Sequence, residues 1–565
     1  SGWRSTRWLA TSQLLAVPPS SSLWPRSINP ADKARRNQSS TRKAGATNGN
    51  RQQLNGHPAS FRLKDCQPIS LNIHPSQGGP PWRLACGADG PNMGSMQFLL
   101  PRREGLAELA VNCAYMIGND GAPWETHVTY HSGRLTVSRD ARESGRLIAP
   151  WTIAGCGQVA LSTATLLPRD TPYHLVLELC RGTLSRILSQ FAPSFLDQPA
   201  VHGAVSEAER HFVTAALSQH DIERCAREAE ASLAICVNLI RKCLAPALKA
   251  QGPSNVCSRL TGFQIDSPRG LNSLLQSSRT LGNAVFYQSS WRETESNPGE
   301  FNWATWQRDL RRIRQSKRRA ACGPLFRLNR HDLPDWLYLW EEDFDTLQSY
   351  VVNYVQKAVD ALRGDVNLWY VTAGTNIESE LQLGEEHRLR LTLSAIEALR
   401  RADAQTPALV GIRQPWGEYL GHAAIDLSPW QFADIVVRSE LGISGFVLEM
   451  NIACTSDRTL PRDLLELNRL IDHWSTFGLP LVIQLAIATP GKAPVLGQPA
   501  GISTQTVQTV RDIVALLIQK PSVQGIIWGQ FYDRADWKAG VITADGTPKA
   551  VLQTLADCWC RNNDT

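Results

Sequence analysis

The side chains of this sequence that could do chemistry are carboxylates placed singly in or after short apolar segments. Glu449 lies inside the apolar segment 445–451, and Glu380 follows another apolar run at 367–372. Two carboxyl groups that meet in space can serve as a general acid and a base or nucleophile. We therefore predict that Glu449 and Glu380 are the catalytic pair, if the protein is an enzyme.

Each of these carboxylates also has a plainer interpretation. Glu449 could be a buried structural residue paired with an arginine such as Arg413. Glu380 could be a solvated loop charge, and so could its neighbour Glu378. The other carboxylates expected after apolar segments are Glu418, Asp533 and Asp536.

The elements that would position these residues alternate between strand and helix over residues 257–562. Short apolar runs predict strands at 283–287, 320–326, 367–372, 408–412, 445–449, 481–487 and 524–528, with an eighth strand before 283. Helical periodicity falls between them, at 303–315, 343–362, 385–402, 462–477 and 506–518. Repeated strand–helix units of this number predict a (β/α)8 TIM barrel, an α/β fold whose chemistry lies at the carboxyl ends of the strands.

Three further regions precede the barrel. Residues 1–92 are basic and rich in Ser, Asn, Gln and Pro, which predicts a disordered tail. Residues 93–200 predict a small β-sandwich-like module that could bind carbohydrate, with a hairpin whose turn is at 131–134. Residues 201–256 predict a helical bridge, beginning with a capping box at Ser206 and continuing from Asp221 to about 249.

Composition excludes several classes of protein. The chain has 565 residues, 42% of them hydrophobic and 19% charged, which favours globular domains over a disordered or fibrous protein. The net charge of +6 is concentrated in residues 1–70, which hold eleven Lys and Arg against two Asp, so nucleic-acid binding is not predicted. No run of about 18 apolar residues predicts a membrane span. The 13 cysteines without repeating spacing favour reduced thiols and a cytoplasmic location, with secretion as the alternative.

Five pieces of residues 280–555 resemble glycoside hydrolase family 10, the β-1,4-xylanase barrels. They are WRETE at 291–295 with PGEFNW at 298–303, LPDWL at 333–337, Trp369 on the fourth strand, WG with Asp533 and Trp537 on and after the eighth strand, and DGTPK at 545–549. The order and spacing of the pieces carry the resemblance. It implies hydrolysis of O-glycosidic bonds in a β-1,4-linked polysaccharide of xylan type.

The resemblance departs from the family pattern where the catalytic carboxylates should be. Hydrolysis with retention needs two carboxyl groups about 5–5.5 Å apart. The acid/base position falls on Gly374, and the nucleophile position falls on Leu485, or on Gln484 with a shift of one residue. Two hypotheses follow: a hydrolase that has moved its carboxylates, or a catalytically inactive barrel that binds carbohydrate or has a structural role.

Both hypotheses share a set of candidate ligand-binding residues. Amides can hydrogen-bond sugar hydroxyls, and tryptophan faces can stack on sugar rings. The candidates are Asn376, Gln414, Trp416, Asn451, Trp528, Asp533 and Trp537. No nucleotide-binding, zinc-protease or serine-hydrolase motif occurs, so we predict neither a cofactor nor a metal. The substrate and the oligomeric state are left open.

Overall fold

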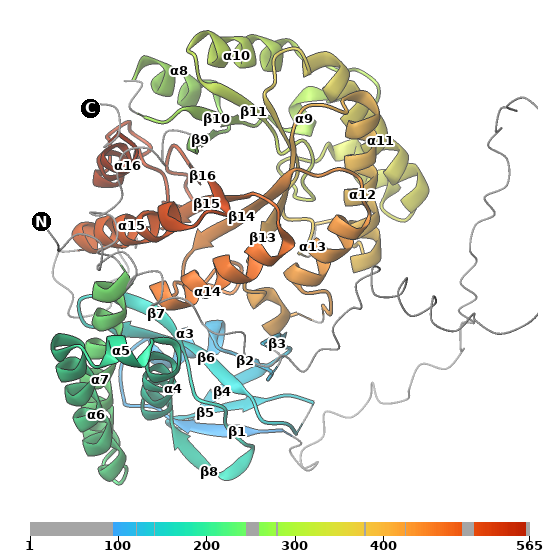
Figure 1. Cartoon of the computed structure of the whole chain (residues 1–565). Coiled ribbons are helices and arrows are strands. Elements are labelled where there is room, and N and C mark those ends of the chain that lie inside the picture. Colours follow the sequence, from blue (N-terminus) through green and yellow to red (C-terminus); the bar gives the residue numbers. More distant parts are fainter. Residues whose placement is uncertain are drawn as a thin grey trace, which may run out of the picture. The chain divides into compact units, whose positions relative to one another are not determined.

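The structure is a computed structural model that describes residues 94–119, 121–140, 142–244, 259–277, 281–377, 380–423, 425–488 and 502–560. Contacts divide the chain into two units, Ser1–Pro91 and Asn92–Thr565. The predicted tail, residues 1–92, lies outside the described residues. All elements labelled in Figure 1 belong to the second unit.

Eight parallel strands close into a barrel in the order β10-β11-β12-β13-β14-β15-β16-β9. Figure 1 shows this barrel with its helices around it. The strands are β9 (Leu260–Ile265), β10 (Ala284–Tyr287), β11 (Arg319–Cys322), β12 (Leu368–Thr372), β13 (Ala408–Arg413), β14 (Gly445–Ile452), β15 (Leu481–Ile487) and β16 (Val523–Trp528). The predicted (β/α)8 barrel is confirmed. The eighth strand expected before residue 283 is β9, which pairs with both β10 and β16.

The helices of the barrel region begin and end close to the predicted positions. They are α8 (Pro268–Gln276), α9 (Trp291–Thr294), α10 (Ala304–Gln315), α11 (Phe344–Leu362), α12 (Glu385–Ala402), α13 (Pro429–Arg438), α14 (Leu464–Trp474), α15 (Ile502–Gln519) and α16 (Ala550–Cys560). Short 3-10 helices are η3 (Asp335–Trp340), η4 (Glu418–Gly421) and η5 (Ser475–Phe477). Side-chain caps fix several starts: Asp343 accepts the Thr346 amide, and Asp463 accepts those of Leu465 and Glu466.

One barrel strand is shorter than its sequence predicts. The apolar run at 320–326 predicts a continuous strand, but β11 ends at Cys322. Gly323 has a φ of 123°, and Pro324 has no N–H to donate to a neighbouring strand. Beyond this break the chain stays beside β12, where the Phe326 amide donates to the Val371 carbonyl at 3.1 Å, and Arg327 follows it.

The residues before the barrel form two four-stranded sheets, in the orders β4-β5-β1-β8 and β3-β2-β6-β7. Their strands are β1 (Met96–Leu99), β2 (Tyr115–Ile117), β3 (Pro123–Trp124), β4 (His127–His131), β5 (Arg134–Ser138), β6 (Arg146–Ile153), β7 (Gly157–Ser162) and β8 (Arg169–His174). The predicted hairpin is confirmed: β4 and β5 pair antiparallel around Ser132 and Gly133, both at positive φ.

Helices also pack in this N-terminal region, and two of them differ from the prediction. The helices are α3 (Leu106–Cys113), α4 (Leu175–Gln190), α5 (Pro193–Leu196), α6 (Pro199–Leu217) and α7 (Ile222–Leu244). The predicted capping box at Ser206 is wrong, because α6 begins at Pro199 and Ser206 lies inside it. The segment of α4 was expected to belong to a β-rich module, but it is a helix buried on most of its sides against α7 and β7.

Buried ion pairs connect the N-terminal region to the barrel. Arg186 of α4 bonds Asp463 at 2.7 Å and Glu466 at 2.9 Å, at the start of α14. The side chain of Arg186 is 8% exposed, and that of Asp463 is 1% exposed. On the far side of α7, Arg241 pairs with Asp512 of α15. The N-terminal region is therefore joined to the barrel by charged contacts as well as by apolar ones.

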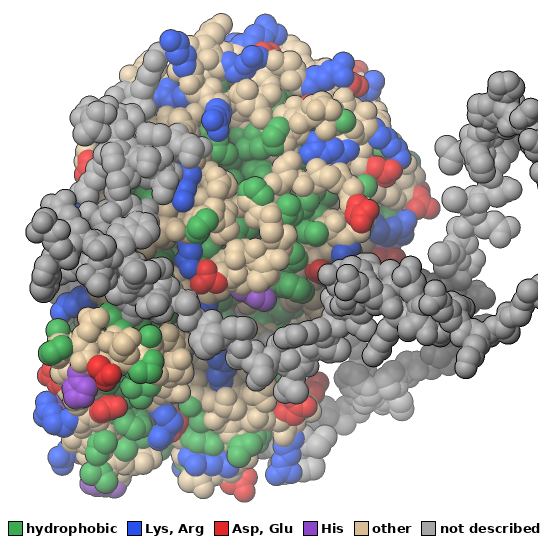
Figure 2. All heavy atoms as spheres, viewed as in Figure 1, with side chains coloured by type: hydrophobic (Ala, Val, Ile, Leu, Met, Phe, Trp, Pro, Cys, Tyr) green, Lys and Arg blue, Asp and Glu red, His purple; other side chains and the backbone are tan. Residues whose placement is uncertain are grey.

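The structure shows how charge is distributed on the surface and whether any helix could span a membrane. Figure 2 shows acidic and basic side chains interspersed over the visible face of the described residues. Within the described ranges, no helix combines the length and apolar character needed to cross a membrane.

Candidate functional site

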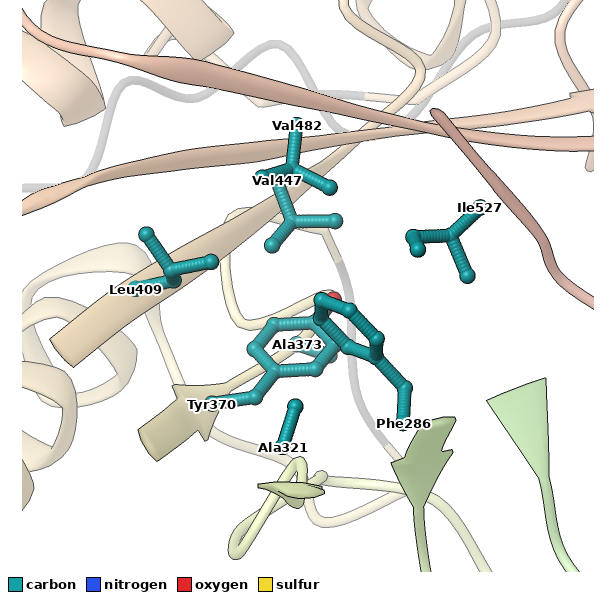
Figure 3. Close-up of a cluster of buried hydrophobic side chains, with 8 residues drawn as sticks. All are labelled: Phe286, Ala321, Tyr370, Ala373, Leu409, Val447, Val482 and Ile527. Carbon is teal, nitrogen blue, oxygen red and sulfur yellow. The ribbon is translucent and has the colours of Figure 1, made fainter. Parts of the chain in front are cut away.

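A ring of apolar side chains fills the interior of the barrel, and the candidate site begins where this ring ends. The ring consists of Phe286, Ala321, Tyr370, Ala373, Leu409, Val447, Val482 and Ile527, whose side chains converge in Figure 3. Side chains alternate along a strand, so the residues two positions further on also point inward. On and just after β10, β14 and β15 these residues are Gln288, Glu449 and Gln484, which form a polar layer at the carboxyl end.

Glu449 is the carboxylate at the centre of this layer. Its side chain is 3% exposed, and its Oε1 accepts a hydrogen bond from the Tyr370 hydroxyl at 2.5 Å. Burial, together with the adjacent carboxylate, raises the pKa of Tyr370, so the hydroxyl keeps its proton and acts as a donor. The nearest guanidinium nitrogen is Arg327 Nη2, at 3.7 Å from Oε1.

Arg413, at the end of β13, is in register with Glu449 on β14. Its backbone is held by Asn376, whose Nδ2 donates to the Arg413 carbonyl at 3.0 Å and whose Oδ1 accepts from the Arg413 amide at 3.1 Å. Gly374 has a φ of 71°, and a Cβ added there would lie 2.8 Å from the Arg413 Cδ. The side chain of Arg413 therefore occupies space that any larger residue at position 374 would need.

Two glutamine oxygens in the polar layer lack hydrogen-bond donors. Gln264 Nε2 donates to Gln288 Oε1 at 2.5 Å, and Gln288 Nε2 lies 3.3 Å from Asp332 Oδ1. The Oε1 atoms of Gln264 and Gln484 are buried and have no partner among the described residues. A buried acceptor without a donor costs about 1–3 kcal/mol, so a hydroxyl supplied at this end of the barrel would be bound favourably.

The two positions that the resemblance assigns to catalytic carboxylates lie in this region. Gly374 follows β12, and Gln484 lies on β15 beside Glu449. Gln484 faces the interior because Val482 does, whereas Leu485 is on the opposite face of the strand and is 1% exposed. Of the two alignments considered for the nucleophile, the one with Gln484 places a side chain inside the barrel.

Glu380, the predicted partner of Glu449, lies in a different environment. Its side chain is exposed, and its amide donates to the carbonyl of Leu328 at 3.2 Å. Glu378 lies outside the described residues. Among the buried carboxylates of the described chain, Glu449 is the one that lies on a barrel strand.

The alternative interpretation of Glu449, a buried structural carboxylate paired with an arginine such as Arg413, finds an ion pair with a different arginine, Arg327. Over the described residues, no carboxylate oxygen lies within 4.0 Å of the Arg413 guanidinium, whereas Arg327 approaches Glu449. Arg413 Nη2 instead lies 3.4 Å from the carbonyl of Asp457. The groups around Glu449 are thus Tyr370 and Arg327.

Two of the predicted aromatic residues are partly accessible and one is not. Trp416 and Trp537 are half-buried, and each lies beneath a guanidinium: Arg462 is 5.6 Å from the ring of Trp416, and Arg458 is 4.4 Å from that of Trp537. Trp528 is 1% exposed, and its Nε1 donates to the carbonyl of Ala539 at 2.9 Å. Its environment is that of a packing residue.

The remaining predicted residues are divided between scaffold and site. Asp533 accepts from Lys549 Nζ at 2.7 Å and from the Gly540 amide at 2.9 Å, which ties the loop after β16 together. Gln414 donates to the carbonyl of Ser456 at 3.3 Å, and its buried Oε1 has no described partner. Asn451 is half-buried and follows the inward positions 447 and 449.

Glu418 and Asp536, the other candidate catalytic carboxylates, lie outside the polar layer. Glu418 is buried, and it accepts from the Leu460 amide at 3.3 Å and lies 3.4 Å from Arg462 Nη2. The same Nη2 contacts the Tyr115 hydroxyl of the N-terminal region at 2.5 Å, so Glu418 belongs to the contact between that region and the barrel. Asp536 is exposed on the loop after β16.

Sequence reasoning did not single out Tyr370 and Arg327 as site residues. Tyr370 lies within an apolar strand, and alternation from Trp369 would have identified it as inward-facing. Arg327 directly follows the segment 320–326 that is predicted as a strand, and no pattern in the sequence marks it as a site residue. No group of three or more His, Cys, Asp or Glu side chains suited to a metal ion occurs in the described part of the chain.

Comparisons with known proteins give matches among solved structures alone. No family model matches the sequence, and no curated protein matches it. Xylanase 10B from Thermotoga petrophila RKU-1, in complex with xylobiose, is 13% identical over 56% of this chain and 97% of that chain, with a TM-score of 0.42. Xylanase B from Clostridium stercorarium F9 is 14% identical over 56% and 99%, with a TM-score of 0.41. Native xylanase10C from Cellvibrio japonicus is 12% identical over 53% and 70%, with a TM-score of 0.43.

Proposed function

We propose that the carboxyl end of the barrel binds carbohydrate and does not carry out hydrolysis by the two-carboxylate retaining mechanism. The observation that carries the proposal is the inward polar layer, in which the buried Oε1 atoms of Gln264 and Gln484 lack described donors. An amide can both donate to and accept from hydroxyl groups, which matches the surface of a sugar. The sequence resemblance to xylanase barrels gives the class of saccharide, β-1,4-linked and of xylan type.

The absence of retaining hydrolysis follows from the residues at the two key positions. Gly374 and Gln484 cannot ionise, so neither can protonate a leaving group or form a glycosyl intermediate. The side chain of Arg413 also approaches the place that a residue 374 side chain would take. Binding alone needs no ionisable group, because hydroxyl contacts and aromatic stacking supply it.

The test is a calorimetric titration of the full chain with xylo-oligosaccharides and with mixed-linkage gluco-oligosaccharides. We expect measurable binding, and we expect Gln484→Leu to weaken it by about tenfold, since a hydrogen-bonding partner inside the site is lost. The matched control is Gln553→Leu, which makes the same change at an exposed position on α16. No binding by the parent chain to any of these saccharides would refute the proposal.

A second candidate function is hydrolysis that uses Glu449 as its acid or base. The observation that favours it is the position of Glu449, which is buried at the carboxyl end of a barrel strand and hydrogen-bonded by Tyr370. The test measures reducing-end release from xylan, mixed-linkage glucan and aryl β-xylosides by the full chain, with Glu449→Gln and Glu380→Gln in parallel. Release that falls by about 100-fold or more in Glu449→Gln would establish this candidate. No release above the blank would exclude it for these substrates.

A further inference from the structure

Two arginines reach the carboxyl end of the barrel without a carboxylate at hydrogen-bonding distance. Arg327 Nη2 lies 3.7 Å from Glu449 Oε1, which already accepts the Tyr370 hydroxyl. The buried Nε of Arg327 has no hydrogen-bond partner among the described residues. Burial opposes the charge of Arg327, but the charges of Glu449 and Asp332 prevail and raise its pKa. The contact with Glu449 is too long for a hydrogen bond, so it is an electrostatic one that leaves the Nε donor without an acceptor among the described residues.

Arg413 is less compensated than Arg327. Its described polar contact is the carbonyl of Asp457, at 3.4 Å, and no described carboxylate lies within 4.0 Å. Burial lowers the pKa of Arg413, which means that the charged form is held in a place where solvent compensates it poorly. A ligand that carries a negative charge would restore this compensation.

The other carboxylates near these arginines already have partners. Asp457 pairs with Arg458 at 2.9 Å, and Asp266 pairs with Arg534. Asp332 accepts from Asn329 Nδ2 at 2.7 Å. These acidic groups thus act on Arg327 and Arg413 only from a distance, because their hydrogen bonds and ion pairs are made with other residues.

The backbone around Arg413 is arranged to hold this side chain. Asn376 bonds both the amide and the carbonyl of Arg413, and Gly374 leaves room for its aliphatic stem. A guanidinium presents a planar set of N–H donors that fits a carboxylate through two parallel hydrogen bonds. An arginine fixed at its backbone loses less conformational freedom when such a ligand binds.

We propose that Arg327 and Arg413 bind the carboxylate of an acidic sugar, a uronic acid residue within the saccharide that occupies the polar layer. The inference rests on the proposed carbohydrate-binding function and adds the chemical class of its ligand. Glu449 favours a monoanion over a phosphate dianion, because its own negative charge lies beside Arg327. The amides of Gln264 and Gln484 then meet the hydroxyls of the same or the adjoining sugar.

The experiment compares two ligands that differ at one group. A xylo-oligosaccharide with a glucuronic acid branch and the same compound with its carboxyl group reduced to an alcohol are titrated into the full chain by calorimetry at low salt. We expect the acidic compound to bind about 10- to 100-fold more tightly, and we expect added salt to narrow the difference. Inorganic phosphate serves as a competitor and is expected to displace the acidic compound weakly.

Variants locate the effect. Arg327→Gln and Arg413→Gln should each remove most of the preference for the acidic compound over the reduced one. Arg327→Lys keeps the charge but loses the planar donor set, so an intermediate preference is expected. The matched control is Arg311→Gln, because Arg311 is 58% exposed and pairs with Asp365 before β12, at the opposite end of the barrel. Circular dichroism of each variant verifies that it is folded.

Two outcomes would overturn the inference alone, and a third would overturn it together with the proposed function. Equal affinity for the acidic and reduced compounds would refute the acidic-sugar site while leaving carbohydrate binding intact. Stronger binding of phosphate than of the acidic compound would replace it with a general anion site. Binding of neither saccharide would refute the proposed function as well.

Discussion

Two groups of arginines in this molecule, one buried and one half-buried, differ in how fully their charges are paired. At the contact between the N-terminal region and the barrel, Arg186 bonds two carboxylates at 2.7 and 2.9 Å. At the carboxyl end of the barrel, Arg327 lies 3.7 Å from its nearest carboxylate oxygen, and Arg413 has no described carboxylate within 4.0 Å. We call the first group closed, because its arginine is hydrogen-bonded to carboxylates. We call the second group open, because its arginines have no described carboxylate at hydrogen-bonding distance.

The difference separates a structural role from a ligand-binding one. Burial opposes the charge of Arg186, but Asp463 and Glu466 more than compensate and raise its pKa. Burial also opposes the charge of Arg413, and there the pKa is lowered because the charge of Glu449 compensates only in part while Arg458 and Arg327 repel the guanidinium. A closed pair stabilises the fold, whereas an open one costs stability that a bound ligand can restore.

Breaking the closed group should have the largest effect on stability. Arg186→Ala leaves the carboxylate of Asp463 buried without its counter-charge, so we expect a loss of about 3–5 kcal/mol in the free energy of unfolding, measured by urea titration. Arg438→Ala is the control, since Arg438 is 76% exposed and pairs with Asp434 on the surface of α13. It should cost less than about 1 kcal/mol. Equal losses in the two variants would remove the distinction between closed and exposed pairs.

The carboxylate of Asp403 is also held by hydrogen bonds, at the start of β12, and these bonds make the stability of the fold depend on pH. Asp403 accepts from Trp369 Nε1 at 2.9 Å and from the Thr406 amide at 3.0 Å. Burial alone would raise its pKa, but these bonds prevail and lower it from 3.8 to about 2. Because the folded pKa is depressed, the stabilisation is complete above about pH 4 and is lost as the pH falls through about 2.

Asp403→Asn tests this group, since it keeps the shape and removes the charge. We expect a loss of up to about 2 kcal/mol at pH 7 and a shallower decline of stability between pH 5 and pH 3 than in the parent chain. Urea titrations at each pH give both quantities. An unchanged acid profile in the variant would show that Asp403 is not held in its charged form by these bonds.

Gly374 lies against the side chain of Arg413, and its substitution is expected to have a smaller effect on stability. Gly374→Ala forces a non-glycine residue to a φ of 71° and places its Cβ against the Arg413 Cδ. We expect a loss of about 1–2 kcal/mol, because the left-handed conformation is strained while the long Arg413 side chain can move aside. Gly384→Ala is the control, since its φ is −62° and an added Cβ meets nothing within 4 Å. Thermal unfolding of the two variants is compared directly, and similar midpoints would argue against strain at position 374.

The barrel could be predicted from the sequence because its elements depend on local patterns. Strands such as β10 are continuous apolar runs, and helices such as α12 have a clear helical period. Two predictions of elements were wrong because the local pattern was missing or was interrupted. Helix α4 is buried on most sides and has no distinct polar face, and the strand predicted at 320–326 is cut short by Gly323 and Pro324.

The candidate site could be predicted only in part. Glu449 was found because a lone carboxylate in an apolar strand is unusual, and its inward position follows from strand alternation. Its contacts with Tyr370 and Arg327 come from β12 and from the chain after β11, so they depend on closure of the barrel. The relation between Gly374 and Arg413 is likewise a contact between different strands. No spacing along the chain encodes such contacts.

The smallest effect on stability is expected from replacing Arg413 of the open group. The sign of the change in the free energy of unfolding distinguishes the two groups most clearly. Arg413→Gln removes a half-buried charge that has no described carboxylate within 4.0 Å, and it keeps an amide group in place of the guanidinium that contacts the carbonyl of Asp457. We expect the free energy of unfolding to stay within about 0.5 kcal/mol of the parent value or to rise, because the desolvation cost of the guanidinium disappears. Urea titration without saccharide measures this, and Arg186→Gln at the closed group is the matched variant. A loss in Arg413→Gln as large as that in Arg186→Gln would mean that Arg413 stabilises the barrel as a structural residue, and the two groups would then not differ in kind.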